Sequence, residues 1–231
     1  MKQPLADYDI MKSELIKNIT GVSALLGLVL SATAGVPAGP PPPIAPIPAG
    51  LNPAGPDYPF PSGSDGVPVA TGYELFASGG PVYVTDLGPT GASYDEDLFV
   101  ANPPSPYGVF MNDHSTPNGT TYYLGTFAAG TEIEFGLDVT STGNVWYDGP
   151  ASRNADNVVH AYLLNNYEGL ADTTYVGFED EAYPGGDFNY VDERYAFTGT
   201  SSAPAPDAAS TLPLLGLGLG TLACFGRRFR K

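Results

Sequence analysis

Residues 131–139 read Thr-Glu-Ile-Glu-Phe-Gly-Leu-Asp-Val, a stretch in which every second residue is apolar. Successive side chains of a β-strand point to opposite faces of its sheet. The apolar residues would therefore share one face: Ile133, Phe135, Leu137 and Val139. The acidic residues would share the other: Glu132, Glu134 and Asp138. The stretch predicts a strand with one buried face and one face in water.

Weaker strand patterns occur along the chain on both sides of this stretch. They cover residues 72–77, 81–87, 97–101, 121–127, 158–164, 173–179 and 193–198. Glycine-, proline- and asparagine-rich clusters separate most of them, and no run of ten or more residues has a convincing helical period. Short strands at this spacing indicate an all-β domain over residues 69–200, an antiparallel β-sandwich of jelly-roll-like type.

The N-terminal residues have the features of a secretory signal peptide. A basic flank precedes a short apolar run at residues 21–30, and Ala32 and Ala34 form an A-x-A cleavage site after it. This order predicts an exported chain from which signal peptidase removes residues 1–34. The basic flank begins at Met11, which we suspect is the true start. A buried helix is the alternative.

The C-terminal residues have the features of a membrane-spanning segment. Residues 208–226 carry no charge, and as a helix they would span about 28 Å, close to the roughly 30 Å of a bilayer core. Arg227 and Arg228 begin a basic tail that should stay in the cytoplasm.

The same tail resembles the PEP-CTERM sorting signal in the residues that precede the apolar run. Pro206, Asp207, Ser210 and Thr211 match the V-P-D-G-G-S-T variant of that motif. The resemblance implies that residues 201–231 are a sorting signal read by an exosortase, a membrane transpeptidase. It also implies a Gram-negative bacterium that secretes exopolysaccharide, with the protein delivered to the cell surface or the extracellular matrix. A plain membrane anchor is the alternative.

The segment between the two ends is strongly acidic. Of the 25 acidic residues of the chain, 21 lie within residues 35–206, together with only two arginines, so that this part carries a formal charge of −19. Such a charge excludes nucleic acid as a partner and favours divalent cations. Residues 35–68 are rich in proline and predict an extended linker.

Six carboxylates and one amide gather in residues 177–193, GFEDEAYPGGDFNYVDE. Glu179 and Asp180 end one predicted strand, and Asp187, Asn189 and Asp192 precede the next. A turn between the strands could bring their oxygens together, and Ca²⁺ prefers six to eight oxygen ligands. A bound cation would also remove the repulsion between the carboxylates. The alternative is a solvated acidic turn.

This acidic hairpin resembles the bacterial domain of unknown function 4114. The resemblance rests on residues 174–180, the Gly-Gly turn, the Asp-x-Asn-Tyr-x-Asp run at 187–192 and the strand that follows. Members of that family occur in exported adhesin-like and matrix proteins. The resemblance implies Ca²⁺ binding by the hairpin and no enzymatic activity.

Two other functions compete with this reading. Trp146 and Tyr147 could stack on a sugar as in a carbohydrate-binding module, although core filling is the favoured explanation of these rings. Glu179 and Asp192 could act as the carboxylate pair of a glycoside hydrolase. A second acidic group, residues 95–97, could be a solvated turn or could complete the cation site. We expect a non-enzymatic exported surface or matrix protein that binds Ca²⁺ and associates with exopolysaccharide.

Overall fold

The computed structural model describes residues 36–54, 66–88, 93–103 and 107–205. The predicted signal peptide, its alanines Ala32 and Ala34 and the start at Met11 lie outside the described residues. The same holds for Pro206, Asp207, Ser210, Thr211, Arg227 and Arg228 of the predicted sorting signal. Within the described part, no helix is long and apolar enough to cross a membrane.

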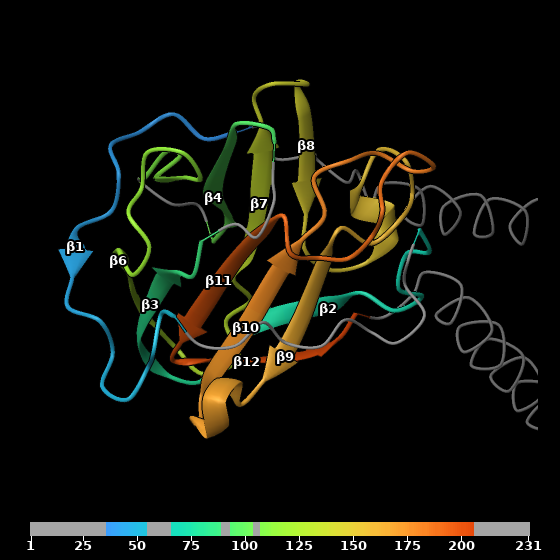
Figure 1. Ribbon diagram of the computed structural model, residues 1–231. Helices are drawn as coiled ribbons and strands as arrows, with labels where there is room; N and C mark the ends of the chain where they lie inside the picture. The colour runs from blue at the N-terminus through green and yellow to red at the C-terminus, as the bar shows by residue number, and fades with distance from the viewer. Residues whose placement is uncertain (1–35, 55–65, 89–92, 104–106, 206–231) are drawn as a thin grey trace, which may run out of the picture. The chain divides into compact units, whose positions relative to one another are not determined.

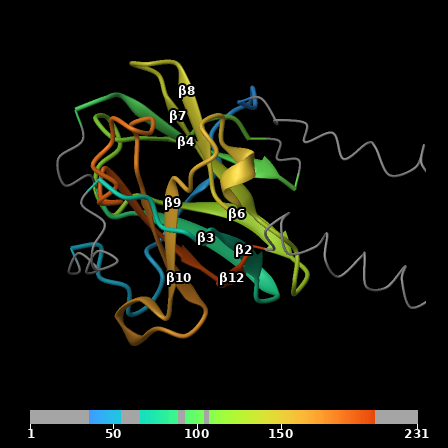
Figure 2. The same ribbon diagram turned by 90° about the vertical axis from the view of Figure 1, so that its right-hand side faces the viewer.

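The described residues form three antiparallel sheets (Figures 1 and 2). The largest sheet has the order β1 (Ile44–Ala45), β6 (Thr121–Phe127), β3 (Gly80–Asp86), β11 (Glu193–Thr198), β10 (Thr173–Phe178) and β9 (Ala161–Asn165). A four-stranded sheet contains β5 (Met111–Asn112), β4 (Glu96–Asn102), β7 (Glu134–Val139) and β8 (Asn144–Tyr147). β12 (Thr200–Pro204) pairs with β2 (Tyr73–Ala77). Two single 3-10 turns, η1 (Ala151–Arg153) and η2 (Tyr167–Gly169), are the described helical elements.

The alternating stretch lies where its pattern predicts. Its four apolar side chains, from Ile133 to Val139, are fully buried. Phe135 of β7 stacks on Phe197 of β11, with ring centroids 4.8 Å apart, and meets Phe178 of β10 edge-on at 5.7 Å. β7 and β11 belong to different sheets, so these rings fill the space between two sheets. The predicted all-β sandwich is confirmed.

Part of the predicted linker lies on the sandwich. Ile44 and Ala45 pair with Tyr122 and Thr121 at the edge of the large sheet. Leu51 is buried and belongs to a small apolar cluster with the rings of η2 and β10. An edge position tolerates prolines because one side of an edge strand needs no donors. The proline pattern therefore predicts an extended segment. It does not predict that this segment packs on the sandwich.

Candidate metal centre

The acidic loop connects two paired strands. β10 and β11 form an antiparallel pair in which Phe178 lies opposite Glu193. Glu179 and Asp192, the next residues inward along the loop, therefore face each other where the strands separate. The two strands that were predicted to flank the acidic hairpin are thus paired, and residues 179–192 form the loop between them.

Three carboxylates converge at this point. Glu179, Asp180 and Asp192 each offer one oxygen, and the three oxygens lie within 4.8 Å of one another. Glu179 is 1% exposed, and its Oε2 has no hydrogen-bond partner among the described residues. Its Oε1 accepts a hydrogen bond from the Glu181 backbone N–H at 3.3 Å. A buried carboxylate oxygen without a donor is costly, which makes this oxygen a candidate ligand for a cation.

A pocket of about 400 Å³ opens on this cluster. Its lining consists of Ser93, Tyr94, Glu179, Asp180, Glu181, Asp187 and Asp192. Tyr94 donates a hydrogen bond from its hydroxyl to Glu181 at 3.3 Å. The segment before β4 therefore closes one side of the pocket and the hairpin loop the other, which leaves room for a cation and for water ligands.

The electrostatics of the cluster oppose three negative charges. Burial, followed by repulsion from Asp192 and Asp187, raises the pKa of Glu179 to about 8. Burial and then the charge of Asp180 raise the pKa of Asp192 to about 7. Burial also raises the pKa of Asp180. Without a cation, the folded protein therefore retains protons here at pH values where a free carboxyl group has lost them.

Two consecutive side-chain turns shape the far end of the loop. Asp187 Oδ1 accepts a hydrogen bond from the Asn189 N–H at 3.0 Å, and Asn189 Oδ1 accepts one from the Val191 N–H at 3.0 Å. The residues between them, Phe188 and Tyr190, have left-handed backbone angles with φ of 51° and 58°. Both rings are fully buried, so their packing offsets the strain of that conformation.

The predicted ligands divide into two groups. Glu179, Asp180 and Asp192 form the cluster, and Asp187 lines the same pocket from an exposed position. Asn189 does not belong to the residues that line the pocket. Its amide nitrogen donates to Asp187 Oδ2 at 2.8 Å. Asn189 therefore orients Asp187, because its own side-chain atoms bond within the loop.

Two glycines make room for the loop. A Cβ on Gly186 would collide with Oε1 of Glu179, and a Cβ on Gly177 would collide with the carbonyl oxygen of Tyr190. At Gly186 the missing Cβ leaves room for the carboxylate of Glu179, a candidate ligand. At Gly177 it lets the loop backbone at Tyr190 lie directly against β10. Both positions are therefore explained by the packing of the site.

The rings of Trp146 and Tyr147 are not a sugar platform. Trp146 is 2% exposed, and its ring stacks on His160 at 3.8 Å between centroids. Tyr147 is buried and meets Phe99 edge-on. A stacking platform needs an open ring face, and neither residue offers one, so this prediction is corrected by their burial. Trp146 instead donates a hydrogen bond from its indole N–H to the Asp180 carbonyl at 2.8 Å.

A second carboxylate group, which the sequence reading gave no role of its own, lies beside the first. It consists of Glu96, Asp113 and Glu193, again with one oxygen of each within 4.8 Å of the others. Glu96 is the middle residue of the acidic run 95–97. The signal that could have found it is the period of two, which places Glu96 on the same face as the buried Leu98.

The donor atoms of both groups are carboxylate oxygens. Oxygen-only sites suit hard cations such as Ca²⁺ and Mg²⁺ better than zinc or copper. The carboxylates of the first group converge on one point, where a cation could be held. Two carboxylates of a glycosidase instead stand about 5–10 Å apart on either side of a bond.

Comparison with known proteins adds no family. A scan against protein-family models and searches of curated proteins and of solved structures found no match to this chain. The two family resemblances of the sequence therefore stay predictions, and the function is argued from the site.

Proposed function

We propose that this protein is a non-enzymatic Ca²⁺-binding β-sandwich that works outside the cell. The observation that carries the proposal is the unpartnered Oε2 of Glu179, which is buried beside Asp180 and Asp192. A cation placed among these oxygens would supply the missing charge. Its remaining ligands would come from Asp187 and from water in the pocket.

Calcium fits this site better than magnesium. Ca²⁺ accepts six to eight oxygens in flexible geometry at about 2.3–2.6 Å, whereas Mg²⁺ demands a near-ideal octahedron at about 2.0–2.1 Å. Oxygens up to 4.8 Å apart match the span across one Ca²⁺ ion. The exposed position of Asp187 suits a flexible coordination shell rather than a rigid one.

The extracellular role is supported by the sequence pattern of the two ends. A signal peptide and an exosortase-read tail would deliver the acidic domain to the surface or the matrix of a Gram-negative cell. There, Ca²⁺ is abundant enough to occupy a weak site. A cation bound in an open pocket could also bridge the domain to an acidic exopolysaccharide, which a chain of this charge would otherwise repel.

The test is thermal unfolding of the full chain in a mild non-ionic detergent. Unfolding is compared in excess EDTA and in millimolar Ca²⁺ for the wild type and for Asp187→Asn/Asp192→Asn. A ligand at about 100 times its Kd adds about 2.7 kcal/mol, which raises Tm by several degrees. We expect this rise in the wild type and its loss in the variant.

A matched control is Asp138→Asn/Asp172→Asn, which removes two charges that belong neither to the pocket lining nor to the carboxylate groups. This control should keep the full Ca²⁺-dependent rise. An equal rise in the hairpin variant, or no rise in the wild type, would refute the proposed site. Mg²⁺ at the same concentration should give a smaller shift than Ca²⁺.

A further inference from the structure

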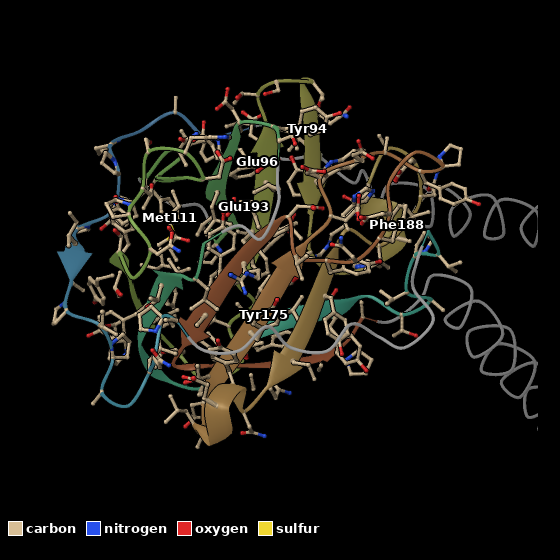
Figure 3. All side chains as sticks on the ribbon, viewed as in Figure 1. Tyr94, Glu96, Met111, Tyr175, Phe188 and Glu193 are labelled. Atoms are coloured by element: carbon tan, nitrogen blue, oxygen red, sulfur yellow. The ribbon has the colours of Figure 1, made fainter. Side chains whose placement is uncertain are left out.

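Two glutamates point into the interior of the sandwich from opposite sheets. Glu96 is the first residue of β4, and Glu193 is the first residue of β11. Because side chains alternate along a strand, Glu96 shares a face with Leu98, and Glu193 shares one with Phe197. Leu98 and Phe197 both belong to the main apolar core. Figure 3 shows Glu96 and Glu193 near each other between β4 and β11.

Asp113, just after β5, joins these two residues. One oxygen of each residue lies within 4.8 Å of the other two. The position of Asp113 is fixed by Glu96, whose backbone N–H donates to Asp113 Oδ1 at 3.0 Å. The Asp113 N–H in turn donates to the Glu96 carbonyl at 3.2 Å. The three carboxylates therefore come from two sheets and form one group.

The group is more deeply buried than the hairpin cluster. Glu96 is 0% exposed and Glu193 is 1% exposed. Among the described residues, neither oxygen of Glu96 has a hydrogen-bond partner, and Oε1 of Glu193 has none. Buried carboxylates are normally paired or fully hydrogen-bonded, because the cost of removing them from water is high. These oxygens are arranged for a ligand that the amino acids do not provide.

A positive charge from the chain itself is scarce in this region. All lysines lie outside the described residues, at positions 2, 12, 17 and 231. Arg153 bonds to Glu74 and Glu132, in a different network. Arg194, the neighbour of Glu193 on β11, donates to the carbonyls of Gly88 and Leu87. His114 contacts Asp113 from the exposed side and also reaches Asp95 at 3.1 Å. An ion from solution is the simplest source of the missing charge.

We propose that Glu96, Asp113 and Glu193 bind a second divalent cation, enclosed between the two sheets. The geometry suits the same hard, oxygen-preferring class of ion as the hairpin site. The bound ion would link three parts of the chain: β4, β11 and the turn that follows β5. It would thereby close this end of the sandwich. This inference uses none of the hairpin ligands, so it does not depend on the proposed function.

The two sites adjoin through Glu96 and Asp180. Their carboxyl groups interact directly. Two ionised carboxylates offer each other no hydrogen-bond donor, so this contact does not supply the positive charge that the second group lacks.

The experiment is a count of bound Ca²⁺ per chain by equilibrium dialysis and elemental analysis. The full chain in mild detergent is compared with Glu96→Gln/Glu193→Gln and with Asp187→Asn/Asp192→Asn. Glutamine keeps the shape of glutamate and needs no cation. We expect two ions in the wild type and one in each variant. The Asp138→Asn/Asp172→Asn control should keep two.

The outcomes separate the two proposals. If one ion binds and only the hairpin variant loses it, the second site is refuted and the proposed function stands. If one ion binds and only the Glu96/Glu193 variant loses it, the second site stands and the hairpin site is refuted. If the wild type binds no ion, both are refuted. Should the glutamine variant fail to fold, Asp113→Asn serves in its place, and retention of two ions by it would refute the second site.

Discussion

Trp146 and His160 stack face to face, with ring centroids 3.8 Å apart and planes 1° from parallel. Trp146 donates to the carbonyl of Asp180 at 2.8 Å, and Nδ1 of His160 lies 2.9 Å from the carbonyl of Glu179. Two consecutive carbonyls of the acidic segment are thus held by a pair of stacked, buried rings. The backbone that carries two candidate ligands is fixed by the core of the sandwich.

Replacement of Trp146 tests this arrangement. Trp146→Phe keeps an aromatic ring and loses the N–H that holds Asp180. Outer contacts of metal ligands typically contribute about 10–100-fold to affinity. We expect Ca²⁺ affinity to fall by about 10-fold, measured by calorimetric titration. Tyr183→Phe, a change in an exposed ring of the same loop, should leave the affinity unchanged, and an equal loss in that control would contradict the role of Trp146.

Gly186 offers a test that leaves every carboxylate in place. A Cβ at this position would collide with Oε1 of Glu179 and displace a candidate ligand. Gly186→Ala should therefore weaken Ca²⁺ binding by about 10-fold or more. The neighbouring Gly185→Ala meets only the Ala182 carbonyl oxygen, at 3.2 Å, and should bind almost normally. Similar affinities for the two variants in a Ca²⁺ titration would argue against Glu179 as a ligand.

The stability of the metal-free protein should fall as pH rises. The pKa of Glu179 is raised from 4.5 to about 8, first by burial and then by Asp192. The pKa of Asp192 is raised from 3.8 to about 7, first by burial and then by Asp180. A raised pKa means that the folded state holds the proton more tightly than the unfolded chain. The resulting stability is full below the ordinary values and is lost as pH rises through 7 and 8.

Thermal unfolding between pH 5 and pH 8.5 checks this dependence. In EDTA, Tm should decrease by several degrees across the range. In saturating Ca²⁺, the decrease should shrink or reverse, because a cation prefers the ionised carboxylates. A Tm that increases with pH in EDTA would contradict the burial of these groups without a positive partner.

Phe135 tests the core between the sheets. It is fully buried and contacts rings of β10 and β11 across the sandwich. Phe135→Ala should lower the free energy of unfolding by about 3–5 kcal/mol, as measured by denaturant titration. Tyr183→Ala, at a half-exposed ring, should change it by less than about 0.5 kcal/mol. Comparable losses in the two variants would contradict the assignment of Phe135 to the core.

The strand within residues 131–139 was predictable because apolar and acidic residues alternate there. Residues 121–127 and 193–198 were predicted with the observed bounds from their flanking turns, although β11 is buried on both faces. β1, β5, β8 and β12 were missed. β1 and β5 have only two residues each. β8 is only four residues long, and β12, TSSAP, has little apolar character. Its partner β2 supplies the apolar side chains of that pair, including the fully buried Leu75.

The hairpin carboxylates were predictable because they are close together in the sequence. Glu96 was considered only as part of an acidic run that could complete the hairpin site, and Asp113 was given no role, since both reach Glu193 only through the packing of two sheets. The roles of Trp146 and Asn189 were also hidden. An aromatic residue and an amide can each serve several purposes in a protein. Only the hydrogen bond from Trp146 to Asp180 and the one from Asn189 to Asp187 show which purpose applies here.

β1 has a consequence for how this protein behaves at high concentration. Its two residues cover part of β6, and prolines stand at positions 43 and 46 on either side of them. An uncovered edge strand recruits strands of other chains and starts aggregates. Pro43 and Pro46 have no N–H, so this short cover offers an incoming strand few donors. Crowded copies would thus be hindered from pairing through this one edge of the large sheet.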